Sequence, residues 1–196
     1  MSEIKSAREI ALEKIAKLSQ ATEEERLRWK YVPEGEKLAV EYLSEGLDLV
    51  AQLARYEEKA KKHVINGAET VLLINISLPK NDPAKSKNKR AMDALMSLKN
   101  DKAAVMKVYN KIRHVFNNYT KQGEQHRKQA YESLKAEFQT RLKQAVEQQI
   151  GSAEGLEISV ESLPQFQEEW QRTLVQLDSQ YIGLLDEYKQ ELNSIN

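Results

Sequence analysis

Residues 105–145 read VMKVYNKIRHVFNNYTKQGEQHRKQAYESLKAEFQTRLKQA, and apolar side chains recur through them at steps of three and four residues. Only an α-helix places positions with those steps on one face, because 3.6 residues complete a turn. The surrounding segment, 84–150, contains no proline and one glycine, Gly123. Unbroken, such a helix would measure roughly 100 Å, wider than a small globular core. The segment therefore predicts an all-α fold: an elongated antiparallel helical bundle with long helices and coiled-coil-like packing.

Prolines and glycines divide the rest of the chain into shorter segments. We predict a single domain, 1–196. Its approximate helices are 4–19, 23–31, 35–78, 84–150 and 163–193, and the fourth of them allows breaks near residues 100 and 123. The turn between the second and third helices is YVPEGEK (31–37), which contains a proline and a glycine. PKNDPAKSKNK (79–89) and the glycine-rich stretch 151–165 predict loops.

Local signals refine two of these helices. In the first, one stripe is formed by Ile4, Ala7, Ala11, Ile15 and Leu18. Thr22 and Glu25 have capping-box spacing ahead of the second helix.

The β-branched stretch TVLLINISL (70–78) is compatible with a strand. No partner strand is evident, and a lone strand leaves its backbone groups unpaired, so we interpret it as the end of a helix.

The final helix carries the most regular apolar pattern in the chain. Its seam alternates steps of four and three and consists of Trp170, Leu174, Leu177, Tyr181, Leu184 and Tyr188. A heptad seam of this kind requires a helical partner, either in the same chain or in a second copy. We expect a partner or oligomer seam at these residues.

Charge is distributed unevenly although the chain is neutral overall. Residues 59–146 carry a net charge of +12, against −4 for 1–58 and −8 for 147–196. The densest cations, a candidate anion-binding set, are Lys80, Lys85, Lys87, Lys89 and Arg90. The competing interpretation, which we favour, is that the basic middle of the chain packs beside the acidic final helix.

No constellation in the sequence indicates catalysis. The chain has no cysteine, which excludes disulfides and thiolate metal sites. Its histidines, His63, His114 and His126, lack the spacing that joins two on one helix face. We therefore predict no catalytic, cofactor-binding or metal residues. No signal peptide or membrane-length apolar run is present, so we expect a cytoplasmic protein without a membrane partner.

Trp29 and Tyr31 flank Lys30 just before the predicted turn. We favour a hydrophobic plug at the end of the bundle for these aromatic side chains. The alternative is an aromatic anchor for a partner, because Trp and Tyr are enriched at interface hot spots.

Four segments resemble a family of uncharacterised bacterial proteins, small and all-helical, with a domain of unknown function. They are SAREIALEKI (6–15), WKYVPEGEKLA (29–39), LPKNDPAK (78–85) and the pair PQFQEEW and LDSQY (164–170, 177–181). The resemblance implies a bacterial cytosolic helical protein and transfers no functional residue.

These observations favour a non-enzymatic helical scaffold or protein-interaction module that self-associates, with a protein partner or a second copy as its ligand. The alternative is an anion- or nucleic-acid-binding protein that uses the basic residues of 80–90, nucleic acid being the less favoured partner. A remote alternative is an enzyme with a cleft between helices.

Overall fold

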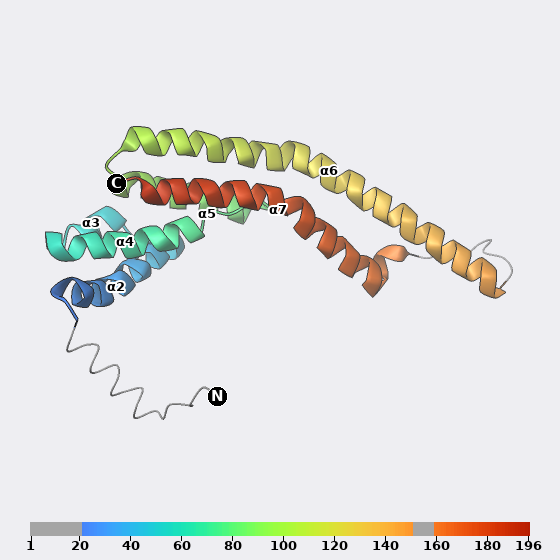
Figure 1. Cartoon of the computed structure of the whole chain (residues 1–196), viewed down its shortest axis with the longest axis horizontal. Helices are drawn as coiled ribbons and strands as arrows, with labels where there is room; N and C mark the ends of the chain where they lie inside the picture. The colour runs from blue at the N-terminus through green and yellow to red at the C-terminus, as the bar shows by residue number, and fades with distance from the viewer. Residues whose placement is uncertain (1–20, 151–158) are drawn as a thin grey trace, which may run out of the picture. The chain divides into compact units, whose positions relative to one another are not determined.

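The computed structural model describes residues 21–150 and 159–196 and confirms the all-α fold, with no strand in those ranges (Figure 1). Their helices are α2 (Glu23–Glu45), α3 (Leu49–Leu53), α4 (Glu58–Ile74), α5 (Asp82–Leu98), α6 (Lys102–Ile150), the 3-10 helix η1 (Val160–Ser162) and α7 (Pro164–Ser194). The chain divides into two compact units. Unit 1 comprises 1–76, 86–102 and 196, and unit 2 comprises 77–85 and 103–195.

In unit 1, α2 begins at the predicted capping box. The Thr22 hydroxyl accepts from the Glu25 N–H (3.2 Å), and the Glu25 carboxylate accepts from the Thr22 N–H (2.8 Å). The predicted turn at 31–37 is wrong, because α2 continues through Pro33. Pro33 has no N–H to donate to the carbonyl of Trp29, but this face of the helix is exposed, so water can satisfy that carbonyl.

Glycines allow α2 and α4 to cross at very short range. A Cβ on Gly35 would lie 1.9 Å from the Val64 carbonyl oxygen, and one on Gly67 would lie 2.0 Å from the Val32 carbonyl oxygen. Both glycines are buried within their helices. Gly35, which suggested a turn, therefore lies at a helix crossing. The lack of a side chain on each of the two glycines lets the backbones of α2 and α4 approach closely.

The predicted single helix over 35–78 is also wrong. The chain leaves α2 at Gly46, whose φ of 80° is left-handed and favours glycine. The short α3 is then capped by the Asp48 carboxylate, which accepts from the Ala51 N–H (3.1 Å). After α4 ends at Ile74, residues 75–78 are neither helix nor strand, so the stretch 70–78 is helical only in its first half.

Most of the predicted loop 79–89 is helical. The Asn81 side-chain oxygen accepts from the Ala84 N–H (2.9 Å), which stabilises the first turn of α5. Pro83 lies in that turn, where a missing N–H removes no intrahelical bond. The break allowed near residue 100 is present, since α5 ends at Leu98 and α6 begins at Lys102.

In unit 2, α6 and α7 pack side by side and antiparallel (Figure 1). Tyr119 contacts Tyr181 edge to face at 5.3 Å, and Tyr131 contacts Phe166 at 5.5 Å and Trp170 at 5.1 Å between ring centroids. The allowed break near 123 is absent, because α6 is continuous for 49 residues. The predicted helix 4–19 and residues 151–158 of the second loop lie outside the described residues.

Candidate functional site

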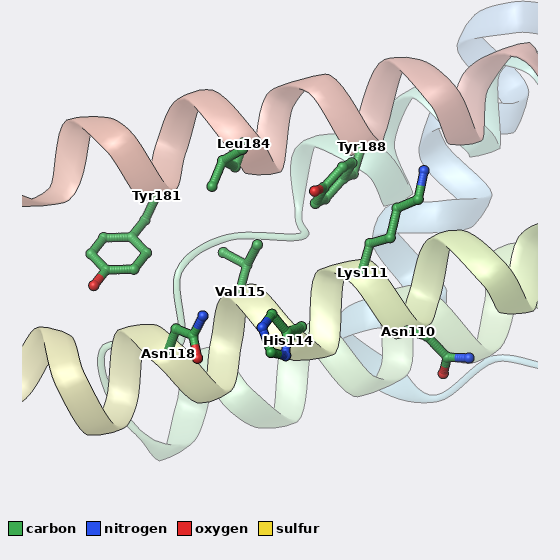
Figure 2. Close-up of a pocket in the computed structure, with 8 residues that line it drawn as sticks. All are labelled: Asn110, Lys111, His114, Val115, Asn118, Tyr181, Leu184 and Tyr188. Carbon is green, nitrogen blue, oxygen red and sulfur yellow. The ribbon is translucent and has the colours of Figure 1, made fainter.

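An open groove of about 430 Å³ lies between α6 and α7 of unit 2. Its lining comes from Asn110, Lys111, His114, Val115, Asn118, Tyr181, Leu184 and Tyr188. Figure 2 shows the three α7 side chains pointing toward α6, and Val115 pointing back toward α7. The volume falls within the range of ordinary ligand pockets, about 300–1,000 Å³.

The floor of the groove is apolar. Val115 is 5% exposed and Tyr181 is 9% exposed, so both belong to the packed interior of unit 2. Leu184 is 43% exposed although it belongs to the heptad seam. An isobutyl group in that position is available to another apolar surface.

One wall of the groove contains a paired cation. Lys111 Nζ lies 2.8 Å from a Glu191 carboxylate oxygen and 5.4 Å from the centroid of the Tyr188 ring. The hydrogen bond with Glu191, with the charge of that carboxylate, raises the pKa of Lys111. The pair joins α6 to α7 at the end of the groove and leaves no unpaired ammonium there.

A buried ionic cluster adjoins the groove through Tyr181. Asp178, one helical turn before Tyr181, is 3% exposed. One carboxylate oxygen lies 2.7 Å from Lys80 Nζ, and the other, 3.9 Å from an Arg127 nitrogen, accepts no hydrogen bond among the described residues. The Asp178–Lys80 pair therefore attaches the segment 77–85 to α7 within unit 2.

Tyr119 completes this cluster. The Arg127 guanidinium stacks 4.2 Å from the centroid of its ring and donates to its carbonyl oxygen (3.2 Å). Burial raises the pKa of Tyr119, and the negative charge of Asp178 adds to that effect. The pKa of Lys80 is raised by its hydrogen bond with Asp178. The cluster thus favours a protonated Tyr119 phenol and a protonated Lys80 ammonium beside the Asp178 carboxylate.

The predicted seam residues divide between the interhelical packing and the groove. Tyr181 lies against Tyr119 and Trp170 against Tyr131, so α6 of the same chain is their helical partner. Leu174 and Leu177 are half-buried on α7. Tyr181, Leu184 and Tyr188 line the groove.

The predicted anion-binding residues do not act as five free cations. Lys80 pairs with Asp178, and Lys85 pairs with Asp82 at 2.8 Å. The Arg90 guanidinium lies over the ring of Tyr42 and donates to its carbonyl oxygen.

The remaining two cations, Lys87 and Lys89, are exposed on α5. With Arg90 they belong to unit 1, whereas Lys80 and Lys85 belong to unit 2. Of the predicted set, only Lys87 and Lys89 are therefore exposed in unit 1 without a printed ion pair or ring contact.

The three histidines lie in different environments. His114 lines the groove, His126 is exposed, and His63 is buried with Nε2 3.4 Å from a Glu24 carboxylate oxygen. Within residues 21–150 and 159–196, no group of three or more His, Asp or Glu side chains is arranged to hold a metal ion. None of the helices described there is long and apolar enough to cross a membrane.

Sequence reasoning missed part of this site. Asp178 follows Leu174 by four residues and precedes Tyr181 by three, so it lies on the inward face of the final helix. A carboxylate at such a position was a signal for a buried ion pair. The groove residues His114 and Asn118 had no comparable signal, because polar residues at their spacing usually occupy an exposed face.

The fold and the groove define the class: an all-α protein with two helical units and an interhelical groove. The chain belongs to a family of unknown function, DUF6657, whose family model matches residues 50–194. The matched range includes α4 to α7 and hence the whole groove. No curated protein and no solved structure matches the chain at a significant level.

Proposed function

We propose that the chain is a non-enzymatic, cytoplasmic interaction module that self-associates through the α6/α7 groove of unit 2. The observation that carries the proposal is the exposure of Leu184, at 43%, inside a groove that Tyr181 and Tyr188 also line. An apolar group with large aromatic neighbours is the usual composition of an interface centre. The proposed occupant of the groove is a second copy of the chain.

Charge complementarity supports a second copy as that occupant. Residues 102–123 of α6 contain five Lys or Arg and no Asp or Glu. Residues 178–194 of α7 contain four Asp or Glu and one Lys. Of these charged residues only Lys111 lines the groove, and it is paired with Glu191 in the same chain. In a two-fold arrangement the other charges of the two helices can pair around the groove, because each patch meets its counterpart twice.

The association should be weak. One exposed leucine per copy, with the ring edges beside it, supports far less buried area than the roughly 1,600 Å² of a standard stable interface. A dissociation constant on the order of 10–100 µM, about −7 to −5.5 kcal/mol, is the appropriate expectation. Dimers would then form only at high protein concentration.

Leu184→Glu is expected to abolish this dimer, because it places a charge in the apolar centre of the interface. The measurement is multi-angle light scattering from about 5 to 500 µM, a range that brackets the expected dissociation constant. Val175→Glu is the matched control, since Val175 is 69% exposed on the same helix and outside the groove. The control should dimerise like the wild type.

Two results would contradict the proposal. One is a strictly monomeric wild type throughout that range. The other is equal loss of the dimer in the Leu184→Glu and Val175→Glu proteins, which would indicate an interface elsewhere on α7.

The anion-binding alternative now rests on Lys87 and Lys89, the two exposed cations of the set. If it operates, purified protein should carry nucleic acid, seen as a raised 260/280 nm absorbance ratio. Two phosphate contacts predict only a shallow salt dependence, a slope of about −1.8 in log K against log salt for duplex DNA. Lys87→Ala/Lys89→Ala should abolish binding, and binding unchanged in that variant would rule out this patch.

A further inference from the structure

One side of α6 in unit 2 carries basic side chains at a constant spacing. This basic row consists of four residues, each seven after the one before: Lys107, His114, Lys121 and Lys128. Seven residues are close to two helical turns, so the row drifts by only about 20° with each step. All four residues are exposed. Ile112 is fully buried and lies two residues, about 200° of helix, before His114. The row therefore lies on the side of α6 that faces away from the interior of unit 2.

The lysines of the basic row have no anionic partner. Among the described residues, no ion pair or hydrogen bond involves any of the three. The segment 102–123 contains no Asp or Glu. Glu124 is exposed, three residues after Lys121 and four before Lys128, yet it pairs with neither of these lysines in the part of the chain that the structure describes. The row is therefore a line of three uncompensated ammonium groups.

The row ends at Lys128. Glu132 lies four residues further on the same side of α6, and its carboxylate reverses the charge there. Lys135, the next position at the spacing of the row, is paired with the Glu161 carboxylate. The uncompensated cations of this side are thus confined to residues 107–128.

The surroundings of the row disfavour partners that need apolar contacts. Every exposed residue from 107 to 128 is polar, and among them are the amides Asn110, Asn117 and Gln125. Figure 2 shows Asn110 pointing away from α7. A partner helix or a membrane surface would require apolar side chains on this side of the helix. A surface of ammonium and amide groups instead suits phosphate oxygens, because both groups donate hydrogen bonds to them.

The row also lacks the side chains that bind single strands. Non-specific binding of single-stranded nucleic acid uses exposed aromatic rings on which the bases stack. No Phe, Tyr or Trp is exposed between residues 107 and 128. Trp29, which is 48% exposed rather than a buried plug, lies on α2 in unit 1. A duplex requires no such rings, because its bases are already stacked on one another.

The spacing of the three lysines matches a duplex. Lys107 and Lys121 are about 21 Å apart along the helix, and Lys121 and Lys128 about 10.5 Å, so the row divides about 31 Å in the ratio two to one. One turn of B-DNA is about 34 Å long, and its major groove is about twice as wide as its minor groove. A helix that lies along the duplex therefore places the three ammonium groups near three successive crossings of the backbone. The flexible lysine stems can absorb the small difference in length.

We propose that the basic row binds the phosphate backbone of duplex DNA, with α6 lying along the duplex for about one turn. Lys107 and Lys128 contact the same strand one turn apart, and Lys121 contacts the other strand between them. Lysine binds phosphate as a point charge, so the row recognises the spacing of the backbones and no base sequence. The inference does not rest on self-association, because DNA binding is measured whatever the oligomeric state.

Fluorescence anisotropy of a labelled duplex of about 24 base pairs, a little over two turns, measures binding by the full chain. We expect a dissociation constant on the order of 100 µM at about 50 mM salt, and a slope of about −2.7 in log K against log salt for three phosphate contacts. The Lys107→Gln/Lys121→Gln/Lys128→Gln protein should bind at least tenfold more weakly. Glutamine is nearly as good a helix former as lysine, so α6 is retained. No binding by the wild type up to about 1 mM, or wild-type binding by the triple variant, would overturn the proposal.

The control removes the same number of charges from unit 1. Lys37→Gln/Lys87→Gln/Lys89→Gln alters three exposed lysines there and should bind like the wild type. Because this variant includes Lys87 and Lys89, it also separates the basic row from the alternative anion site on α5. A loss in the control equal to that in the row variant would show that net charge governs binding, and would overturn the proposal.

A charge-conserving variant tests the spacing itself. Lys121→Gln/Gln122→Lys keeps the net charge and moves one ammonium group by about 100° round α6. It should bind at least threefold more weakly than the wild type, because the middle phosphate contact is lost. In the opposite direction, Glu124→Gln removes the carboxylate beside the row and should tighten binding about twofold. Wild-type affinity in the shifted variant, or equal affinity for a single strand of the same length, would overturn the assignment to duplex DNA.

Discussion

Replacing Gly67 with alanine is expected to separate α2 from α4 and to destabilise unit 1 by about 3–5 kcal/mol, above the usual 1–3 kcal/mol for overpacking. The added Cβ would lie 2.0 Å from the Val32 carbonyl oxygen and 3.0 Å from the Glu36 nitrogen. Backbone atoms inside a helix cannot rotate away as a flexible side chain can. The two helices must therefore move apart and lose the packing of the fully buried Val64 and Ala68.

Urea denaturation measures this effect, with Trp29 fluorescence in a Trp170→Phe background as the reporter of unit 1. The matched control is Gly183→Ala in α7, where an added Cβ meets nothing within 4 Å; because it lies in unit 2, it is followed by Trp170 fluorescence in a Trp29→Phe background. Because alanine is the better helix former by about 1 kcal/mol, the control should be slightly stabilised. Helix propensity alone would predict the same sign at both positions. A Gly67→Ala protein as stable as its parent would therefore refute the close crossing.

The crossing also shows what the sequence could and could not predict. The helical period of residues 105–145 predicted helix because it is a local property of the chain. Pro33 and Gly35 carry a local turn signal, but packing against Gly67 decided their conformation. No local pattern indicates that the two glycine-containing segments, distant in the sequence, cross closely, since that crossing depends on the tertiary fold. Gly46 lies inside the predicted helix 35–78 but ends α2 instead.

In the candidate site, too, the local pattern predicted some features and the tertiary packing decided the others. The heptad pattern correctly selected Tyr181 and Trp170 as inward-facing residues of the final helix. It did not predict that Leu184 would remain 43% exposed, because exposure depends on the side chains that α6 presents opposite. Charge counting paired the basic middle with the acidic end, and Lys111–Glu191 is one such pair. Lys80–Asp178 joins the same two blocks, but charge counting did not predict that Asp178 would be buried, because composition does not report burial.

The second large effect is expected at that buried pair. Lys80→Met would leave the Asp178 carboxylate 3% exposed, with Arg127 as the nearest cation at 3.9 Å. Breaking a buried pair by removing one partner costs about 3–5 kcal/mol. We expect a loss of about 2–4 kcal/mol in unit 2, because the arginine compensates for part of the charge.

The reverse substitution should cost much less. In Asp178→Leu the Lys80 side chain, 59% exposed, can turn its ammonium toward water. The expected cost is about 1 kcal/mol, chiefly from the polar contacts that Tyr119 and Arg127 lose. The double variant Lys80→Met/Asp178→Leu should be as stable as Asp178→Leu alone, since no buried charge remains without a partner.

Urea denaturation reported by Trp170 in a Trp29→Phe background gives all four corners of this double-mutant cycle. Equal, additive losses in the two single variants would show that the pair is not coupled. The predicted order of stability is wild type, then Asp178→Leu together with the double variant, then Lys80→Met.

Alkaline titration separates this ion pair from simple packing. The hydrogen bond with Asp178 raises the folded-state pKa of Lys80 above the ordinary 10.5. Its stabilisation is therefore fully present below 10.5 and is lost as the pH rises through the folded-state pKa. Tyr119 acts in the same direction from about pH 10, because its pKa is also raised, chiefly by burial.

The stability difference between wild type and Lys80→Met should thus be constant from pH 8 to 10 and shrink above 10.5. A difference that stays constant to pH 11.5 would mean that Lys80 stabilises unit 2 through its aliphatic stem rather than its charge.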